Sequence, residues 1–251
     1  MAISFGRGIP LNGLVCHLDP GNPSSYPGSG GTIKDLRGLT GDSSISGLTS
    51  YDSTNRLLVG SSNLVVTIPY AAWMNTVFDS LSGSWSIIQW TRSDDLTYPR
   101  AADGGMVNTG YGSTTTRGFD WNHGVGNLST IRFSGSAGTD VNAASTGYDF
   151  DQTLNLTTIP SSSTTYCRAL WWDRSTNTCG AFINGVDNGS VSMSAVAGFR
   201  IYDGSGSITL GTLYGWQHIG RKGSVLIYNR KLSADEYYQI YISQRLYHGA
   251  P

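Results

Sequence analysis

The sequence predicts an all-β fold, a sandwich of two antiparallel sheets with one short helix at the C-terminal end. Charged residues make up only 13% of the 251 positions, and strong helix formers are scarce, since Lys occurs three times and Glu once. Apolar segments of four to eight residues alternate with clusters of Gly, Ser, Asn and Asp, a spacing typical of two packed antiparallel sheets.

Nine segments are expected to form strands, because each is apolar and is bounded by turn-forming residues. In chain order they are Gly13–Asp19, Leu57–Val59, Asn63–Ile68, Trp85–Arg92, Thr130–Phe133, Cys167–Asp173, Gly180–Ile183, His218–Gly220 and Val225–Asn229. Asn184-Gly185 stands between apolar residues and predicts a tight hairpin. Residues 70–78 are expected to form one or two helical turns. No linker or repeat divides the chain, so we expect one domain over residues 13–251, preceded by an N-terminal arm at residues 1–12.

The C-terminal helix is predicted from its start signal. Ser233 and Glu236 have the spacing of a capping box, in which each side chain accepts a hydrogen bond from the other residue's backbone amide. Leu232 and Tyr237 occupy the two positions of a hydrophobic staple. Apolar residues then recur at helical spacing up to Tyr241, which predicts a helix lying with one face on the sandwich.

Charge and cysteine content exclude several classes of protein. The net charge is −1 and the arginines are scattered, which argues against a nucleic-acid partner. The first residues have no basic segment followed by an apolar one, and no apolar run is long enough for membrane insertion, so we expect no signal peptide and synthesis in a cytoplasm. Cys16, Cys167 and Cys179 lack metal-site spacing. A hairpin that turns at Ser175-Thr176 would place Cys179 opposite Trp172, so reduced, buried cysteines are favoured over a disulfide.

Two segments resemble a known family. "IYNRKLSADEYYQIY", residues 227–241, is similar to the closing segment of laminin G-like domains in the concanavalin A-like lectin/glucanase superfamily. "GLVCHLDPGNPSSYPGSGGTIKDLRG", residues 13–38, resembles the opening of such domains in bacteriophage structural proteins. "SWSIIQWTR" and "CGAFINGVDNG" resemble the family's middle strands more generically. The resemblance covers residues 13–245 and implies a jelly-roll-like, concanavalin A-like sandwich.

The resemblance implies a non-enzymatic bacteriophage virion protein. The glucanases of the superfamily carry an E-x-D-x-x-E strand that this chain lacks, and its single glutamate, Glu236, is assigned to the helix cap. A single compact domain favours an exterior capsid decoration or cement protein. Such a protein would bind the major capsid protein or other virion proteins, form homo-oligomers on the particle, and be located in the virion.

The alternative is a carbohydrate-binding module of a virion appendage that attaches to host glycans. "GFDWNHG" supplies an aromatic side chain for stacking on a sugar, Trp121, and polar neighbours for hydrogen bonding, Asp120, Asn122 and His123. Tyr98 and Tyr111, from the preceding loop-rich stretch, are possible additions to this site. The competing interpretation is a strand with one buried tryptophan and polar flanks.

Five apolar residues are candidates for a partner interface. Trp171 and Trp172 must lie on opposite faces of a strand, so one belongs to the core and the other is covered by loops or by a partner. Ile3, Phe5 and Ile9 belong to the arm, which docks either on a neighbouring subunit or on its own domain.

No cofactor is expected. Calcium is the one alternative, because related domains bind it through carboxylate and amide oxygens. The conceivable ligands are Asp19, Asp120, Asp173 and Asp203, although no calcium loop motif is present and the four histidines lack ligand spacing.

Overall fold

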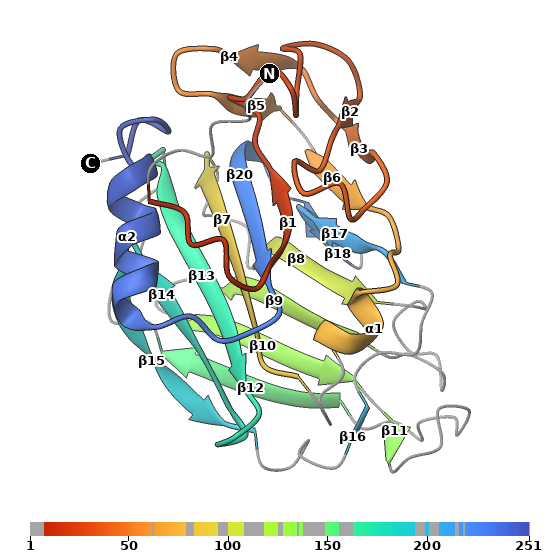
Figure 1. Cartoon of the computed structure of the whole chain (residues 1–251), viewed down its shortest axis with the longest axis vertical. Helices are drawn as coiled ribbons and strands as arrows, with labels where there is room; N and C mark the ends of the chain where they lie inside the picture. The colour runs from red at the N-terminus through yellow and green to blue at the C-terminus, as the bar shows by residue number, and fades with distance from the viewer. Residues whose placement is uncertain are drawn as a thin grey trace.

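The protein is described by a computed structural model, shown in Figure 1. All atoms are described for residues 8–61, 63–78, 83–92, 94, 163–193, 206–211 and 219–250. The backbone alone is described for residues 93, 100–107, 118–124, 128–134, 136–137, 149–155, 199–200, 212–213 and 216–217. The chain folds into two antiparallel sheets packed face to face, with a short helix against one of them (Figure 1).

The first sheet has eight strands in the order β15-β14-β13-β7-β20-β5-β4, with β1 also paired to β20. Its strands are β1 (Leu14–Leu18), β4 (Ser50–Asp52), β5 (Leu57–Gly60), β7 (Trp85–Ser93), β13 (Tyr166–Asp173), β14 (Thr178–Ile183), β15 (Val186–Ser192) and β20 (Gly220–Tyr228). Strand β20 combines two predicted strands, because a bulge between Lys222 and Val225 keeps both halves paired with β7.

The second sheet also has eight strands, in the order β12-β10-β9-β8-β17-β6-β3-β2. They are β2 (Thr32–Ile33), β3 (Ser43–Ser46), β6 (Val65–Ile68), β8 (Arg100–Val107), β9 (Gly118–Gly124), β10 (Leu128–Ser134), β12 (Asp149–Asn155) and β17 (Ile208–Leu210). Two short pairs join β11 (Ser136–Ala137) to β16 (Phe199–Arg200) and β18 (Thr212–Leu213) to β19 (Trp216–Gln217). The helices are α1 (Met74–Val77) and α2 (Ala234–Gln244), as the sequence predicts.

The main hydrophobic core lies between the two sheets. The first sheet contributes Trp85, Ile87 and Trp172 among others, and the second contributes residues such as Ile68 and Ile208. All five side chains are nearly inaccessible to solvent. Side chains on alternate residues of each strand therefore fill the space between the sheets, as expected for a sandwich.

A second hydrophobic core lies on the other face of the first sheet, beneath α2. Ile88, Trp90 and Leu226, which alternate with the residues of the main core, pack there with Tyr237 and Ile240 of the helix. The central strands β7, β13 and β20 are therefore buried on both faces, which explains why nearly every residue of β13 and β20 is buried.

The two adjacent tryptophans of β13 divide between these cores. Trp172 lies in the core between the sheets and is 0% exposed, whereas Trp171 lies in the core beneath α2 and is 5% exposed. Lys231 covers the ring of Trp171, with its ammonium 3.8 Å from the ring centroid. Packing between the two sheets buries Trp172, whereas α2 and Lys231 cover Trp171, so both side chains are buried within this chain.

The predicted hairpin and the state of the cysteines are both confirmed. Asn184 and Gly185 adopt φ values of 51° and 77°, the left-handed conformation that a tight hairpin turn requires. Cys179 pairs with Trp172 across β13 and β14, as the hairpin register predicts. All three cysteines are buried and free.

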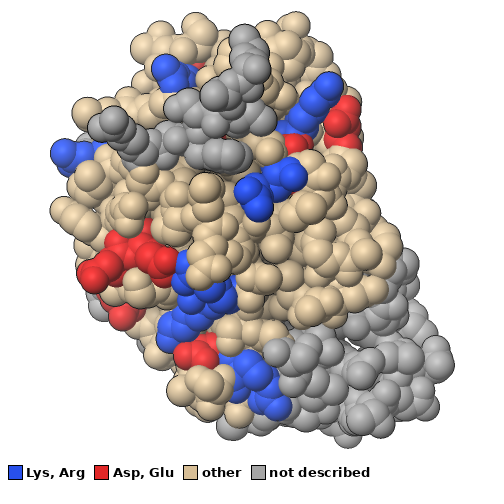
Figure 2. All heavy atoms as spheres, viewed as in Figure 1, with Lys and Arg blue, Asp and Glu red and all other residues tan. Residues whose placement is uncertain are grey.

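Charged side chains form few and small clusters on the surface visible in Figure 2. Four ion pairs account for several of them, joining Arg92 to Asp94, Arg221 to Asp52, Arg230 to Glu236 and Lys231 to Asp173. Neither helix of the described chain has the length and apolar character needed to span a membrane.

Lys222 is a buried cation inside the sandwich. Its side chain is 2% exposed and crosses toward the second sheet, where a Cβ on Gly211 would lie 2.7 Å from its Cε. Among the described residues its ammonium has no hydrogen-bond partner. Burial removes the hydration of the charged form and lowers the pKa of Lys222 to about 7.

Lys222 therefore predicts a specific dependence of stability on pH. Its pKa is depressed on folding, so the unfolded chain binds more protons between pH 7 and about 10.5. The free energy of unfolding should rise across that window, by up to about 5 kcal/mol. Lys222→Met should be more stable than the natural protein at pH 7 and should lose this rise. Urea unfolding at several pH values measures both effects, and equal slopes for the two proteins would contradict the assignment.

Candidate functional site

The glycan site predicted around Trp121 falls on β9, where the structure divides it between two faces of the sheet. Asp120 and Asn122 alternate along the strand with Trp121 and His123, and successive residues of a strand belong to opposite faces. Trp121 pairs with Ile131 of β10, whereas Asp120 pairs with Arg132. Trp121 and His123 therefore belong to one face of the sheet and Asp120 and Asn122 to the other. The glycan site around Trp121 stays a prediction. Tyr98 and Tyr111 lie outside the described residues.

Starting from Asp120, directly paired residues form one line that crosses all eight strands of the second sheet. The residues paired directly with one another along this line, which we call the polar row, are Asp151, Arg132, Asp120, Gly105, Thr209, Thr67, Ser44 and Thr32. On six of these strands, a residue next to the polar row in the chain belongs to the opposite face of the sheet. These residues also pair directly with one another, and they are Phe150, Phe133, Phe119, Met106, Ile208 and Ile68. Along these two rows the faces of the second sheet therefore differ in polarity.

The described side chains show which of these faces meets solvent. Ile208 and Ile68 are 0% exposed in the main core, whereas Thr209 and Thr67 are half-buried and Ser44 is exposed. The polar row therefore belongs to the face of the second sheet that points away from the main core. This face carries only short hydroxyl side chains over β17, β6, β3 and β2 along the row.

The charged residues of the polar row lie on β9, β10 and β12, at one end of the row. Arg132 of β10 pairs in register with Asp120 on one side and with Asp151 on the other, so an arginine position lies between two aspartate positions. Asn122, Thr130 and Thr153 form a second polar line on the same face. Residues of unlike charge at directly paired positions stabilise a sheet, so this register favours the pairing of β9, β10 and β12.

In the sequence analysis, Asp120 and Asn122 are singled out, but none of the hydroxyl residues of the row is. A local signal exists at two positions, because Thr67 stands between Val66 and Ile68 and Thr209 stands between Ile208 and Leu210. The strands are short, however, and their order in the sheet, β17-β6-β3-β2, does not follow the chain. No single segment therefore reveals that these hydroxyls form one line.

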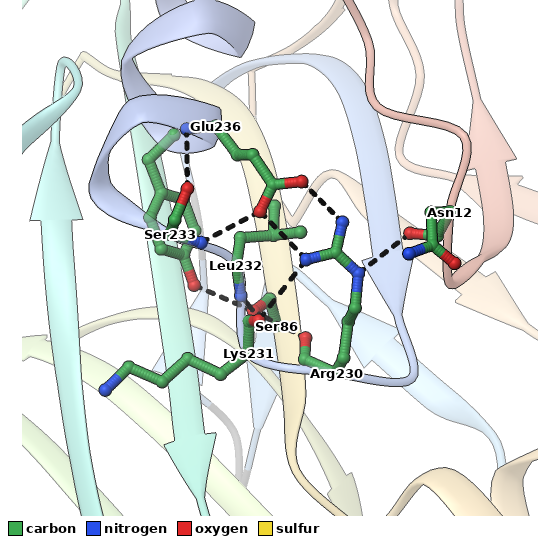
Figure 3. Close-up of polar contacts among 8 residues, drawn as sticks. Asn12, Ser86, Arg230, Lys231, Leu232, Ser233 and Glu236 are labelled. Atoms are coloured by element: carbon green, nitrogen blue, oxygen red, sulfur yellow. Dashed lines mark hydrogen bonds and ion pairs between the residues drawn. The ribbon is translucent and has the colours of Figure 1, made fainter.

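A second group of polar residues fixes the start of α2 (Figure 3). The Ser233 hydroxyl accepts from the Glu236 amide at 3.2 Å, and a Glu236 carboxylate oxygen accepts from the Ser233 amide at 2.9 Å, which confirms the predicted capping box. Arg230 donates from both terminal nitrogens to the Glu236 carboxylate, at 2.5 and 2.8 Å. Its Nε donates to the Asn12 carbonyl at 3.0 Å, which joins the helix start to the N-terminal arm.

Glu236 is thus held as a carboxylate. The hydrogen bonds from Arg230, with help from the Ser233 amide, lower the pKa of the Glu236 carboxyl below its usual value. A general acid in glycoside hydrolysis needs the opposite shift, toward a raised pKa. In this geometry Glu236 stabilises the helix and is unsuited to protonating a leaving group.

Ser224, His248 and Asp19 also contact one another, but their order differs from a hydrolytic triad. Ser224 lies in the middle, with its hydroxyl 2.9 Å from His248 Nε2 and donating to Asp19 Oδ1 at 3.2 Å. In a triad the histidine lies between the other two residues. Burial lowers the pKa of His248 to about 3, and Ser224 and His248 are both 0% exposed. This cluster fixes the C-terminal turn against the sandwich.

The conceivable calcium ligands are engaged in separate networks. Asp19 accepts hydrogen bonds from Ser224 and Tyr247, whereas Asp173 accepts from Ser175 and from the Lys231 ammonium. Asp120 lies on β9, and Asp203 lies outside the described residues. Within the described ranges, no three His, Cys, Asp or Glu side chains are grouped as a metal ion would require.

Comparison with known proteins finds similarity in structure but not in sequence. No protein-family model matches the chain, and no curated protein is significantly similar to it. A Trypanosoma rangeli sialidase solved in complex with sialic acid superposes with a TM-score of 0.64 over 95% of this chain and 34% of its own, at 12% identity.

Two toxin binding domains also superpose. The binding domain of Paraclostridial Mosquitocidal Protein 1 has a TM-score of 0.60 at 18% identity, with 95% of this chain and 55% of that chain covered. The binding domain of Botulinum Neurotoxin DC in complex with SialylT has a TM-score of 0.61 at 9% identity, with 92% and 51% covered. This chain spans about a third of the sialidase and about half of each toxin chain. These likenesses establish the β-sandwich fold.

Two substitutions test the structural assignment of Glu236. Ser233→Ala should lower the free energy of unfolding by about 1 kcal/mol, the usual effect of losing an N-cap side chain. Glu236→Gln keeps an acceptor for the Ser233 amide but loses the ion pair with Arg230, and it should also cost about 1 kcal/mol. Asp235→Asn, an exposed change in the same turn, should cost less than about 0.5 kcal/mol.

Equilibrium unfolding in urea measures all three differences. A Glu236→Gln protein that is as stable as the natural one would contradict the capping assignment. Loss of a hydrolytic activity in Glu236→Gln at unchanged stability would instead assign that residue to catalysis.

Proposed function

We propose that this chain is a glycan-binding module that presents the polar face of its second sheet to carbohydrate. The observation that supports this proposal is the polar row, an unbroken line of hydroxyl, carboxylate, guanidinium and small residues across all eight strands. Strands lie about 4.8 Å apart, so eight strands give the row a length of about 34 Å. That length suits an extended chain of sugar units.

The chemistry of the row matches that of a sugar. Each sugar hydroxyl both donates and accepts hydrogen bonds, and so do the hydroxyls of Thr209, Thr67, Ser44 and Thr32. Short side chains lose little conformational entropy when a ligand immobilises them, which limits the cost of binding over a broad surface. Asp120 and Asn122 would add a carboxylate and an amide at one end of the row.

The structural neighbours favour this proposal over a structural role in a capsid. The sialidase was solved with sialic acid, and the neurotoxin binding domain was solved with SialylT. At 9–12% identity these proteins share a fold with this chain, so their ligands are a reason to test glycans and do not identify the sugar. The laminin G-like variant of the concanavalin A-like sandwich, implied by residues 13–38 and 227–241, is part of the same proposal.

Binding without hydrolysis is the mechanism we propose. The one glutamate of the sequence is engaged by Arg230 and the helix cap, and Ser224 and His248 are buried in a structural cluster. The exterior capsid decoration role, with its homo-oligomer on the virion, stays a prediction from sequence, and none of the three structures named above is a virion protein. Binding of calcium also stays a prediction.

Glycan-array screening followed by titration calorimetry tests the proposal. The triple variant Ser44→Ala, Thr67→Val and Thr209→Val removes three hydroxyls while keeping side chains that favour strands. Each lost hydrogen bond is worth about 1 kcal/mol, so affinity for the identified glycan should fall at least about tenfold. Asp120→Ala with Asn122→Ala should weaken binding further if the ligand extends to β9.

The matched control is Thr176→Val, Thr178→Val and Ser190→Ala. These positions lie on the β13–β14 turn, on β14 and on β15 of the first sheet, so the same chemical changes occur away from the polar row. The control should bind with unchanged affinity. An array without any bound glycan, or equal losses in both triple variants, would contradict the proposal.

A further inference from the structure

An apolar stripe lies on the solvent-facing side of α2, the helix at the left edge of the molecule in Figure 1. Tyr238, Ile242 and Leu246 are 54%, 42% and 82% exposed, and their spacing of four places them along one side of the helix and of the turn that follows it. Val186 is 56% exposed at the β14–β15 turn, where the neighbouring Gly185 lies against Tyr238. Four of the seven large apolar residues that are exposed in the described chain therefore belong to this patch, which we call the α2 stripe.

The arm residues predicted for a partner interface do not belong to this patch as far as the structure describes them. Ile9 is buried in the core beneath α2 with Trp90 and Tyr241, within its own chain. Ile3 and Phe5 lie outside the described residues. The α2 stripe is thus a candidate interface that only the structure reveals.

We propose that the α2 stripe is the interface of a symmetric dimer, in which α2 packs antiparallel against α2 of a second copy. Side chains four positions apart form a ridge on a helix, and two such ridges pack side by side when the helices cross at about 50°. A two-fold axis at Ile242 brings the two Ile242 side chains together and places Tyr238 of each copy beside Leu246 of the other. The stripe is therefore complementary to itself in shape.

Two charged residues flank the stripe on one side. Gly185 of the β14–β15 turn lies against Tyr241 as well as Tyr238, which places the exposed Asp187 of the same turn near the beginning of the stripe. Arg245 lies one helical turn after Tyr241, on the same side of the helix but at the end of the stripe. Neither charged side chain forms an ion pair within the part of the chain that the structure describes.

These two charges match each other across the proposed axis. A two-fold axis perpendicular to the ridge reverses the ends of the stripe and keeps its sides, so Arg245 of each copy would lie near Asp187 of the other. Opposite charges in this arrangement fix the register of the two helices and exclude a parallel one. Charge complementarity with itself favours a second copy of this chain over an unrelated partner.

The area of the stripe predicts a weak dimer. A large apolar side chain has about 200 Å² of surface, so the four stripe residues present roughly 400 Å² in each copy at their observed exposures. Two copies would bury roughly 800 Å² of stripe together with its polar flanks, close to the lower limit of about 1,000 Å² for specific interfaces. The natural protein should therefore dimerise reversibly as its concentration rises.

Sedimentation equilibrium between about 1 μM and about 1 mM tests the proposal. The natural protein should pass from monomer to dimer in this range, and Ile242→Lys, which places two ammonium groups at the axis, should weaken the dimer at least about hundredfold. Leu39→Lys is the matched control, because Leu39 is an apolar residue that is 51% exposed in the loop before β3. A natural protein that stays monomeric at 1 mM would overturn the proposal, and so would equal dimerisation of the two lysine variants.

Disulfide formation tests the antiparallel orientation. A mixture of Tyr238→Cys and Leu246→Cys proteins should form disulfides between the two variants at least about ten times faster than either variant forms them alone, since a disulfide needs Cα atoms within about 7 Å. The natural cysteines are 0–4% exposed, so they do not compete. Faster bonding of Leu246→Cys with itself would indicate parallel helices and overturn the proposed interface.

Charge reversal tests the contact between Arg245 and Asp187. Asp187→Lys and Arg245→Glu should each weaken the dimer about tenfold, because the contact occurs twice, and the double variant should regain most of the affinity. A double variant as weak as the two single losses combined would overturn the register. Circular dichroism confirms that each variant retains the fold. Glycan binding by the monomeric Ile242→Lys variant should be unchanged, so failure of this inference is distinguishable from failure of the proposed function.

Discussion

The burial of the central strands β7, β13 and β20 on both faces is the constraint on which the rest of the structure depends. A sheet with two apolar faces needs a cover on each side. The second sheet covers one face, and α2 covers the other with Tyr237 and Ile240. The capping box and the ion pair between Arg230 and Glu236 fix where α2 begins, and Asn12 joins this point to the arm. The late helix is therefore a required layer of the fold.

The second sheet has a different role because only one of its faces meets the main core. Its other face carries the polar row and meets solvent at Thr67 and Ser44. A sheet held rigid by a core on one side presents short polar side chains at fixed spacing on the other, which is a suitable surface for a polymer of sugars. The first sheet therefore has a hydrophobic core on each of its faces, whereas the second sheet leaves one face for the glycan binding that we propose.

Much of the fold can be predicted from the sequence because it depends on local signals. The capping box, the hairpin at Asn184-Gly185 and the division of Trp171 from Trp172 each depend on a few neighbouring residues. The glycan site predicted around Trp121 groups residues that are adjacent in sequence, and a strand places these residues alternately on its two faces. The polar row depends on the pairing of eight strands that are distant in sequence, so only the sheet order reveals it.

Chemical-shift mapping with the oligosaccharide that binds most tightly is the most direct measurement of where a ligand contacts this protein. Binding at the polar face predicts that the amide signals of Thr32, Ser44, Thr67 and Thr209 move on titration, while those of α2 stay in place. Changes confined to α2 or to the first sheet would contradict the assignment of ligand binding to the second sheet.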